Sequence, residues 1–193
     1  MMTYLNLYGT MRMRFRKILF NLCFFLVIIM NIKYTSADVY KFSFQGIDGN
    51  KINLADYKNK PILIVNTASF CGYTYQYKKL QNLYNNYKNR NLVVIGIPSN
   101  DFGSQEFKKN EEVKNFCETN FDISFLLAVI TNIKGEQGHP FFKWVKNEAG
   151  FLSFPKWNFY KFLIDKNGSL KAWFTSMTEP DSKKFIFDLE SIL

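Results

Sequence analysis

The stretch that decides the fold reads Ile62-Leu63-Ile64-Val65-Asn66-Thr67-Ala68-Ser69-Phe70-Cys71-Gly72-Tyr73-Thr74. Its first four residues are apolar and predict a buried strand, and the small residues after them favour a turn. Apolar and aromatic residues then recur at intervals of three and four over residues 75–87, which predicts a helix. Cys71 is therefore expected where the turn opens into a helix. A helix N-terminus lowers the pKa of a thiol and favours the nucleophilic thiolate, so this stretch indicates cysteine redox chemistry.

Strand, helix and turn signals on both sides of this stretch predict an α/β layout. On the N-terminal side, residues 39–44 alternate apolar and polar side chains, and Asp48-Gly49 marks the turn of a hairpin that returns through residues 51–53. Pro61 starts the first central strand. On the C-terminal side we expect, in order, a strand over 92–97, a loop over 98–107, a helix from Asn110, an apolar stretch over 125–130, a short helix over 141–145, a hairpin of 158–164 with 170–174, and a helix capped by Asp181.

The first 37 residues have the features of a secretory signal peptide or a signal anchor. An apolar run over residues 18–32, which includes Cys23, is followed by the small residues Thr35-Ser36-Ala37, which suit cleavage after Ala37. The run is short for a bilayer span of about 20 residues, which favours cleavage. The basic residues of this segment, which has no acidic one, are Arg12, Arg14, Arg16, Lys17 and Lys33. We expect entry into the secretory pathway and delivery either outside the cell or to a plastid-type organelle.

The remaining segment, residues 38–193, has the size of one domain. It holds 20 basic and 16 acidic residues, so the net charge of +9 for the whole chain falls to +4 here. The lysines are scattered and form no basic block, so we expect no nucleic-acid partner. Outside the leader only two cysteines remain, Cys71 and Cys117.

Three separated motifs together resemble the glutathione-peroxidase-like family, in its cysteine-containing, thioredoxin-dependent form. The resemblance covers residues 39–193 in order and implies a thioredoxin-like fold with an N-terminal β-hairpin in a single domain. The motifs are the segment from Asn66 to Thr74 quoted above, Gly96-Ile97-Pro98-Ser99-Asn100-Asp101-Phe102-Gly103-Ser104-Gln105-Glu106, and Trp157-Asn158-Phe159-Tyr160-Lys161-Phe162-Leu163.

The resemblance implies a catalytic tetrad made of Cys71, Gln105, Trp157 and Asn158. Cys71 would be the nucleophile that attacks hydrogen peroxide or an organic or lipid hydroperoxide, as part of a response to oxidative stress. The two carboxamides and the indole N–H suit this chemistry because they donate hydrogen bonds to a thiolate and to a leaving oxygen. We expect no cofactor and no metal.

By the same resemblance, Cys117 is the resolving cysteine, 46 residues after Cys71. Peroxide would oxidise Cys71 to a sulfenic acid, which condenses with Cys117 to a disulfide. A thioredoxin-like protein, or less readily glutathione, would then reduce that disulfide. If the folded protein holds the two Cα atoms more than about 7 Å apart, the helix of Cys117 must partly unwind.

The sequence departs from the family pattern at four positions outside the tetrad. Ser99 replaces a common cysteine, Asp101 a glutamine, and Phe107 and Leu126 each replace a proline. An insertion carried by tetrameric, glutathione-using members is absent. We therefore expect a monomer with an open site that membrane lipid hydroperoxides can reach.

Other roles for the cysteines are kept as alternatives. Cys71 and Cys117 could form a structural disulfide in a secreted protein, although Gln105 and Trp157 would then be unexplained. A redox sensor or relay that oxidises once without turnover would need the same residues. A dithiol oxidoreductase is disfavoured because Thr74 stands where its second thiol would be. The single histidine, His139, is expected to cap a surface turn and offers no base for a cysteine hydrolase.

Overall fold

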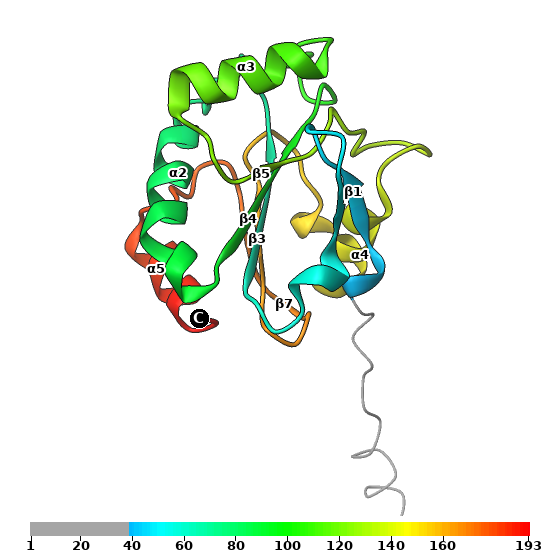
Figure 1. Cartoon of the computed structure of the whole chain (residues 1–193). Helices are drawn as coiled ribbons and strands as arrows, with labels where there is room; N and C mark the ends of the chain where they lie inside the picture. The colour runs from blue at the N-terminus through cyan, green and yellow to red at the C-terminus, as the bar shows by residue number, and fades with distance from the viewer. Residues whose placement is uncertain (1–38) are drawn as a thin grey trace, which may run out of the picture. The chain divides into compact units, whose positions relative to one another are not determined.

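Five strands form the central sheet, in the order β5-β4-β3-β6-β7 (Figure 1). The structure is a computed structural model that describes residues 39–193, so the predicted leader and its cleavage site lie outside the described residues. β3 runs parallel to β4 and antiparallel to β6. The strands are β3 (Ile62–Thr67), β4 (Val93–Pro98), β5 (Leu126–Leu127), β6 (Lys161–Ile164) and β7 (Leu170–Phe174).

Both faces of the sheet are covered, and for this reason every residue of β3 and β4 is buried. Successive side chains of a strand point to opposite faces, so Ile64 packs into one core and Val65 into the other. Figure 1 shows α2 and α5 on one face and α4 with β1 on the other. The helices are α2 (Gln76–Tyr87), α3 (Asn110–Phe121), α4 (Pro140–Ala149) and α5 (Lys183–Glu190). None of the helices within residues 39–193 has the length and apolar character needed to cross a bilayer.

The parallel pair β3 and β4 decides where the functional loops meet. Both strands end at the same edge of the sheet, and Ser99 N donates to Thr67 O at 3.0 Å where they leave it. The loop that contains Cys71 and the loop that contains Gln105 therefore start side by side.

The predicted strand over residues 39–44 is wrong in its first half. Val39–Lys41 forms a 3-10 turn, η1, and only Ser43–Gln45 is strand, β1, paired with β2 (Lys51–Asn53). Phe42 N donates to Val39 O at 3.1 Å, and both side chains are buried three residues apart. The buried apolar residues Val39, Phe42 and Phe44 are three and then two positions apart, which resembles the alternation of a strand. The hairpin turn itself is confirmed, since Gly49 takes the positive φ of +86° that it needs.

Three further boundaries differ from the prediction. Ser182, not Asp181, caps α5, because its side chain accepts from Phe185 N while Asp181 binds Lys79. The apolar stretch over 125–130 contributes only the two residues of β5. The strand expected over 158–164 begins at Lys161, and the residues before it form the bend described below.

Candidate active site

Cys71 lies in a series of turns between β3 and α2. Thr74 holds these turns, because its hydroxyl accepts from Cys71 N at 3.0 Å and donates to Ala68 O at 2.9 Å. The thiol is 7% exposed and its sulfur accepts the Tyr73 N–H at 3.5 Å. α2 starts only at Gln76, so the expectation that Cys71 opens the helix is wrong by one turn. An amide of the turn takes the place of the helix end as the donor to sulfur.

The three predicted partners of Cys71 come together at this edge of the sheet. Asn158 is fully buried, and its Nδ2 donates to Gln105 Oε1 at 3.1 Å and to Phe102 O at 3.4 Å. The Trp157 ring lies beside them: a Cβ placed on Gly103 would be 3.3 Å from the ring and 3.5 Å from Gln105 Cδ. Gln105, Trp157 and Asn158 therefore form one contiguous group.

A backbone hydrogen bond links this group to the Cys71 loop. Phe70 N, in the residue before Cys71, donates to Gln105 O at 2.9 Å. Within residues 39–193, no hydrogen bond joins Cys71 Sγ to the side chains of the other three. The structure thus places all four tetrad positions at one edge, with the sulfur held by its own turn and the carboxamides held by each other.

The Trp157-Asn158 segment is fixed by Asn66, a buried polar residue of β3 that directly follows the apolar run Ile62–Val65. Asn66 Nδ2 donates to Trp157 O at 3.0 Å, and Asn66 Oδ1 accepts from Tyr160 N at 2.9 Å. Between these bonds Phe159 adopts the left-handed region at φ +64°, which is costly for an aromatic residue. Asn66 was not among the site residues predicted from the sequence, although a carboxamide directly after the apolar run Ile62–Val65 was a signal for a role.

A buried lysine supports the same bend. Lys161 is fully buried in β6, and its Nζ donates to Phe159 O at 2.8 Å. Burial lowers the pKa of Lys161 to about 7, against the opposing effect of Glu179. The lysine had no role in the sequence analysis, yet its place in an apolar strand sequence could have drawn attention to it.

Cys117 lies in the middle of α3 and is fully buried. Both cysteines are free thiols, so the structure is that of the reduced protein. Burial raises the pKa of Cys117 to about 12, and the nearby Tyr77 hydroxyl only partly offsets this. While α3 is folded, Cys117 is therefore a protonated thiol enclosed in the core.

Glu106 is a buried acid that the sequence analysis did not single out. It is 5% exposed, its N–H donates to Asn100 Oδ1 at 3.1 Å, and its Oε1 accepts from Phe107 N at 2.9 Å. Burial raises the pKa of Glu106. The carboxylate accepts from the backbone of the next residue, and the backbone N–H of Glu106 closes the same loop onto Asn100.

Two residues outside the tetrad, Asp101 and His139, hold backbone segments in place through hydrogen bonds. Asp101 Oδ2 accepts from Ile133 N at 2.6 Å and from Lys134 N at 2.8 Å, so it anchors the loop of Gln105 to a neighbouring segment. His139 was expected at a surface turn, whereas it is the N-cap of the helix α4, since its Nδ1 accepts from Phe141 N. It is half-buried, because its ring stacks on Phe44 at 4.2 Å, and burial lowers its pKa.

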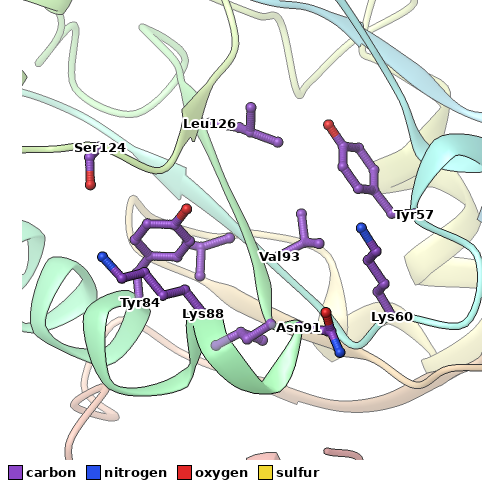
Figure 2. A pocket seen from close by; sticks show the side chains of 10 residues that line it. Tyr57, Lys60, Tyr84, Lys88, Asn91, Val93, Ser124 and Leu126 are labelled. Carbon is purple, nitrogen blue, oxygen red and sulfur yellow. The ribbon is translucent and has the colours of Figure 1, made fainter.

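A cavity of about 280 Å³ lies away from this site (Figure 2). Val93, the first residue of β4, lines the cavity. Cys71 lies in the loop after the end of β3, and β3 runs parallel to β4. The cavity therefore belongs to the opposite end of the sheet. Figure 2 shows the side chains of Tyr57 and Lys60 on one side of it and those of Tyr84 and Lys88 on the other.

Comparisons with known proteins match most of the part of the chain that the structure describes. The family model described as glutathione peroxidase matches residues 39–146. The hydroperoxy fatty acid reductase of Synechocystis sp. is 39% identical, over 80% of this chain and 95% of that protein. A glutathione peroxidase-like peroxiredoxin of Chlamydomonas reinhardtii is 40% identical, over 75% of this chain and 91% of its own length. The crystal structure of T. cruzi GPX1, 29% identical, superposes with a TM-score of 0.62 over 79% of this chain and 97% of that one, which confirms the predicted thioredoxin-like α/β fold.

Proposed function

Because the chain belongs to the glutathione peroxidase family, we propose that it reduces hydroperoxides through Cys71 and Cys117, and that a thioredoxin-like protein reduces the resulting disulfide. The observation that supports this most directly is the hydrogen-bonded pair Gln105 and Asn158 beside the Cys71 loop. Two carboxamides in contact with each other at a buried site have no evident structural need, whereas a peroxidase needs such donors.

In the first step the thiolate of Cys71 attacks the outer peroxide oxygen. The O–O bond breaks, Cys71 becomes a sulfenic acid, and the remaining oxygen leaves as an alcohol or as water after it takes up a proton. Gln105 Oε1 accepts the hydrogen bond from Asn158 Nδ2. The Gln105 amide nitrogen therefore points away from Asn158 and can donate to another group. Together with the half-exposed Trp157 indole N–H it can bind the leaving oxygen.

In the second step the sulfur of Cys117 attacks the sulfenic sulfur of Cys71. An S–S bond forms, the S–O bond breaks, and the hydroxyl leaves as water with the thiol proton of Cys117. The full burial of Cys117 in folded α3 means that this part of the helix must open first. Opening also exposes the thiol to water, where its pKa returns toward the ordinary value of 9.0.

The names of two relatives support a proposal about the substrate. One of them is named for hydroperoxy fatty acids, and another is a peroxiredoxin of glutathione peroxidase type. We propose that this chain, acting as a monomer, takes hydroperoxides of fatty acids and lipids as well as hydrogen peroxide. Phe70, 56% exposed next to Cys71, and the half-exposed Trp157 offer apolar surface for an acyl chain.

A coupled peroxidase assay tests the proposal. Residues 38–193 are supplied with hydrogen peroxide or a fatty-acid hydroperoxide, and turnover with thioredoxin is compared with turnover with glutathione. We expect turnover with thioredoxin and little with glutathione, and none when Cys71→Ser replaces the nucleophile. Faster turnover with glutathione would contradict the two-cysteine route, and activity in the Cys71→Ser protein would contradict the role of Cys71.

The enclosure of Cys117 favours one alternative, a redox sensor that oxidises once and passes its disulfide to a client protein. A resolving thiol that is rarely exposed would make turnover slow. The same assay decides this, since a sensor consumes about one equivalent of peroxide and then stalls even with excess thioredoxin.

We also propose that residues 1–37 direct the protein into the secretory pathway, where it counters oxidative stress. Expression of the full chain in a secretory host, followed by N-terminal sequencing of the product, tests cleavage after Ala37. A product that retains the leader in a membrane fraction would instead indicate a signal anchor.

A further inference from the structure

Three phenylalanine rings join the Cys71 loop to the helix of Cys117. Phe70 directly precedes Cys71, Phe116 directly precedes Cys117, and Phe107 lies in the loop before α3. The ring centroids are 4.5 Å apart for Phe70 and Phe107, 5.6 Å for Phe107 and Phe116, and 6.2 Å for Phe70 and Phe116. Each ring is within the range of favourable aromatic contact with the other two. We name these three residues the aromatic clasp.

The aromatic clasp continues into the core along α3. Phe116 contacts Phe121 at 5.7 Å, and Phe121 contacts the fully buried Tyr77 of α2 at 5.4 Å. At its outer end the clasp reaches solvent, since Phe70 is 56% exposed. A row of aromatic contacts therefore holds α3 against both the Cys71 loop and α2.

Opening of α3 around Cys117 must break the aromatic clasp. The two residues Phe116 and Cys117 are adjacent in one helical turn, so the backbone cannot bring the thiol out of the core and leave the Phe116 ring in place. The strength of the ring contacts thus enters the free-energy cost of exposing Cys117.

We propose that the aromatic clasp sets the rate at which Cys117 reaches the oxidised Cys71. This inference rests on the proposed function, in which Cys117 resolves the sulfenic acid. Two reactions compete for that sulfenic acid. Attack by Cys117 gives the disulfide and water, whereas attack on a second hydroperoxide breaks another O–O bond and gives the sulfinic acid and an alcohol. A tighter clasp leaves more time for the second reaction, so the clasp also sets the sensitivity of the enzyme to over-oxidation.

The test compares Phe116→Ala and Phe107→Ala with the matched control Phe187→Ala, which removes a ring that is 75% exposed on α5 and outside the clasp. Each reduced protein is mixed with one equivalent of hydrogen peroxide and the reaction is quenched at short times. Intact-mass spectrometry then gives the fractions of sulfenic acid and disulfide. We expect the rate of Cys71 oxidation to be unchanged in all variants. Disulfide formation should be about tenfold faster in both clasp variants, because the loss of one to two aromatic contacts changes a rate by about this factor. With excess peroxide, the sulfinic fraction should fall in the same variants.

Hydrogen exchange adds a readout that does not depend on chemistry at Cys71. Amides of α3 in the reduced clasp variants should exchange faster than in the wild type, while those of β3 should not change. If Phe116→Ala fails to fold, Phe116→Leu keeps an apolar side chain without the ring and should change the rate in the same direction.

The outcomes separate this inference from the proposed function. A wild type that oxidises at Cys71 but never forms the disulfide overturns the resolving role of Cys117, and the role of the clasp with it. A wild type that forms the disulfide at the same rate as both clasp variants overturns the clasp alone. Equal acceleration by Phe187→Ala would mean a general loss of stability, and would also overturn it.

Discussion

Asn158 Nδ2 donates a hydrogen bond to Gln105 Oε1 at 3.1 Å, although 53 residues separate the two in the chain. The bond joins the loop after β4 to the bend before β6, and it fixes the orientation of the Gln105 carboxamide. The Gln105 amide nitrogen is thereby aimed as a donor before any substrate arrives, which is the kind of preorganisation that stabilises a developing negative charge.

Gln105→Ala should slow the oxidation of Cys71 by about 10²-fold, the usual effect of one lost donor at such a site. Reduction of the disulfide by thioredoxin should not change, because the donor acts only on the thiolate and the leaving oxygen. Stopped-flow measurement of the peroxide step gives the rate, with Gln137→Ala on an exposed loop as the control. Equal rates in the wild type and Gln105→Ala would assign the motif a structural role.

Cys117→Ser should react once with peroxide at Cys71 and then stop. The sulfenic acid has no thiol to meet, so it should accumulate in a form that a sulfenic-specific reagent can trap, and it should over-oxidise more readily to the sulfinic acid. Mass spectrometry after one equivalent of peroxide checks both expectations. A Cys117→Ser protein that still cycles with thioredoxin would leave a single-cysteine peroxidase.

The buried thiol of Cys117 should make stability fall with rising pH above pH 9. Burial raises its pKa from 9.0 to about 12, so between these values the unfolded chain releases a proton that the folded chain keeps. The contribution is fully present below pH 9 and should be reduced by about 1 kcal/mol at pH 10. Urea unfolding of the wild type and of Cys117→Ala at pH 8 and pH 10 isolates this residue from the tyrosines and lysines that titrate in the same range. Parallel pH dependence in the two proteins would show that Cys117 is not enclosed in solution.

Lys161 should make the free energy of unfolding rise with pH, in a lower pH range than that of Cys117. Burial lowers its pKa from 10.5 to about 7, so from pH 7 upward the unfolded chain binds more protons than the folded chain. The free energy of unfolding should therefore rise with pH by about 1 kcal/mol per unit from pH 7 to pH 9. Lys161→Met should remove this slope, whereas Lys171→Met at an exposed position of β7 should keep it. A slope that survives in Lys161→Met would mean that another group carries it.

The sequence was sufficient to predict the elements that depend on strong local patterns. The apolar run Ile62–Val65 forms most of β3, as its pattern predicted. Cys71 and Gln105 lie at one edge of the sheet because they follow the parallel strands β3 and β4, and Asn158 lies there because it precedes β6, which is antiparallel to β3. The roles of these residues in catalysis stay predictions that rest on the agreement of several motifs.

What the sequence could not predict depends on contacts between distant residues. Val39 joins a 3-10 turn because the core accepts side chains three apart, and Phe159 adopts a left-handed backbone because Asn66 and Lys161 hold its neighbours. Such residues look ordinary in a local pattern. A polar residue in a buried strand signals that it has a partner, but the sequence does not say which one, and Asn66 meets Trp157 across 91 residues.

The complete burial of Cys117 has a consequence for the partner that restores the enzyme. A chain with folded α3 and a chain with a disulfide at Cys117 cannot present the same surface, because one encloses the sulfur and the other must display it. A reductase that recognises the displayed form therefore has no reason to bind the resting enzyme, even when the resting enzyme is in large excess. The reductase would therefore distinguish the oxidised enzyme from the reduced one by its surface shape, before any thiol–disulfide exchange takes place.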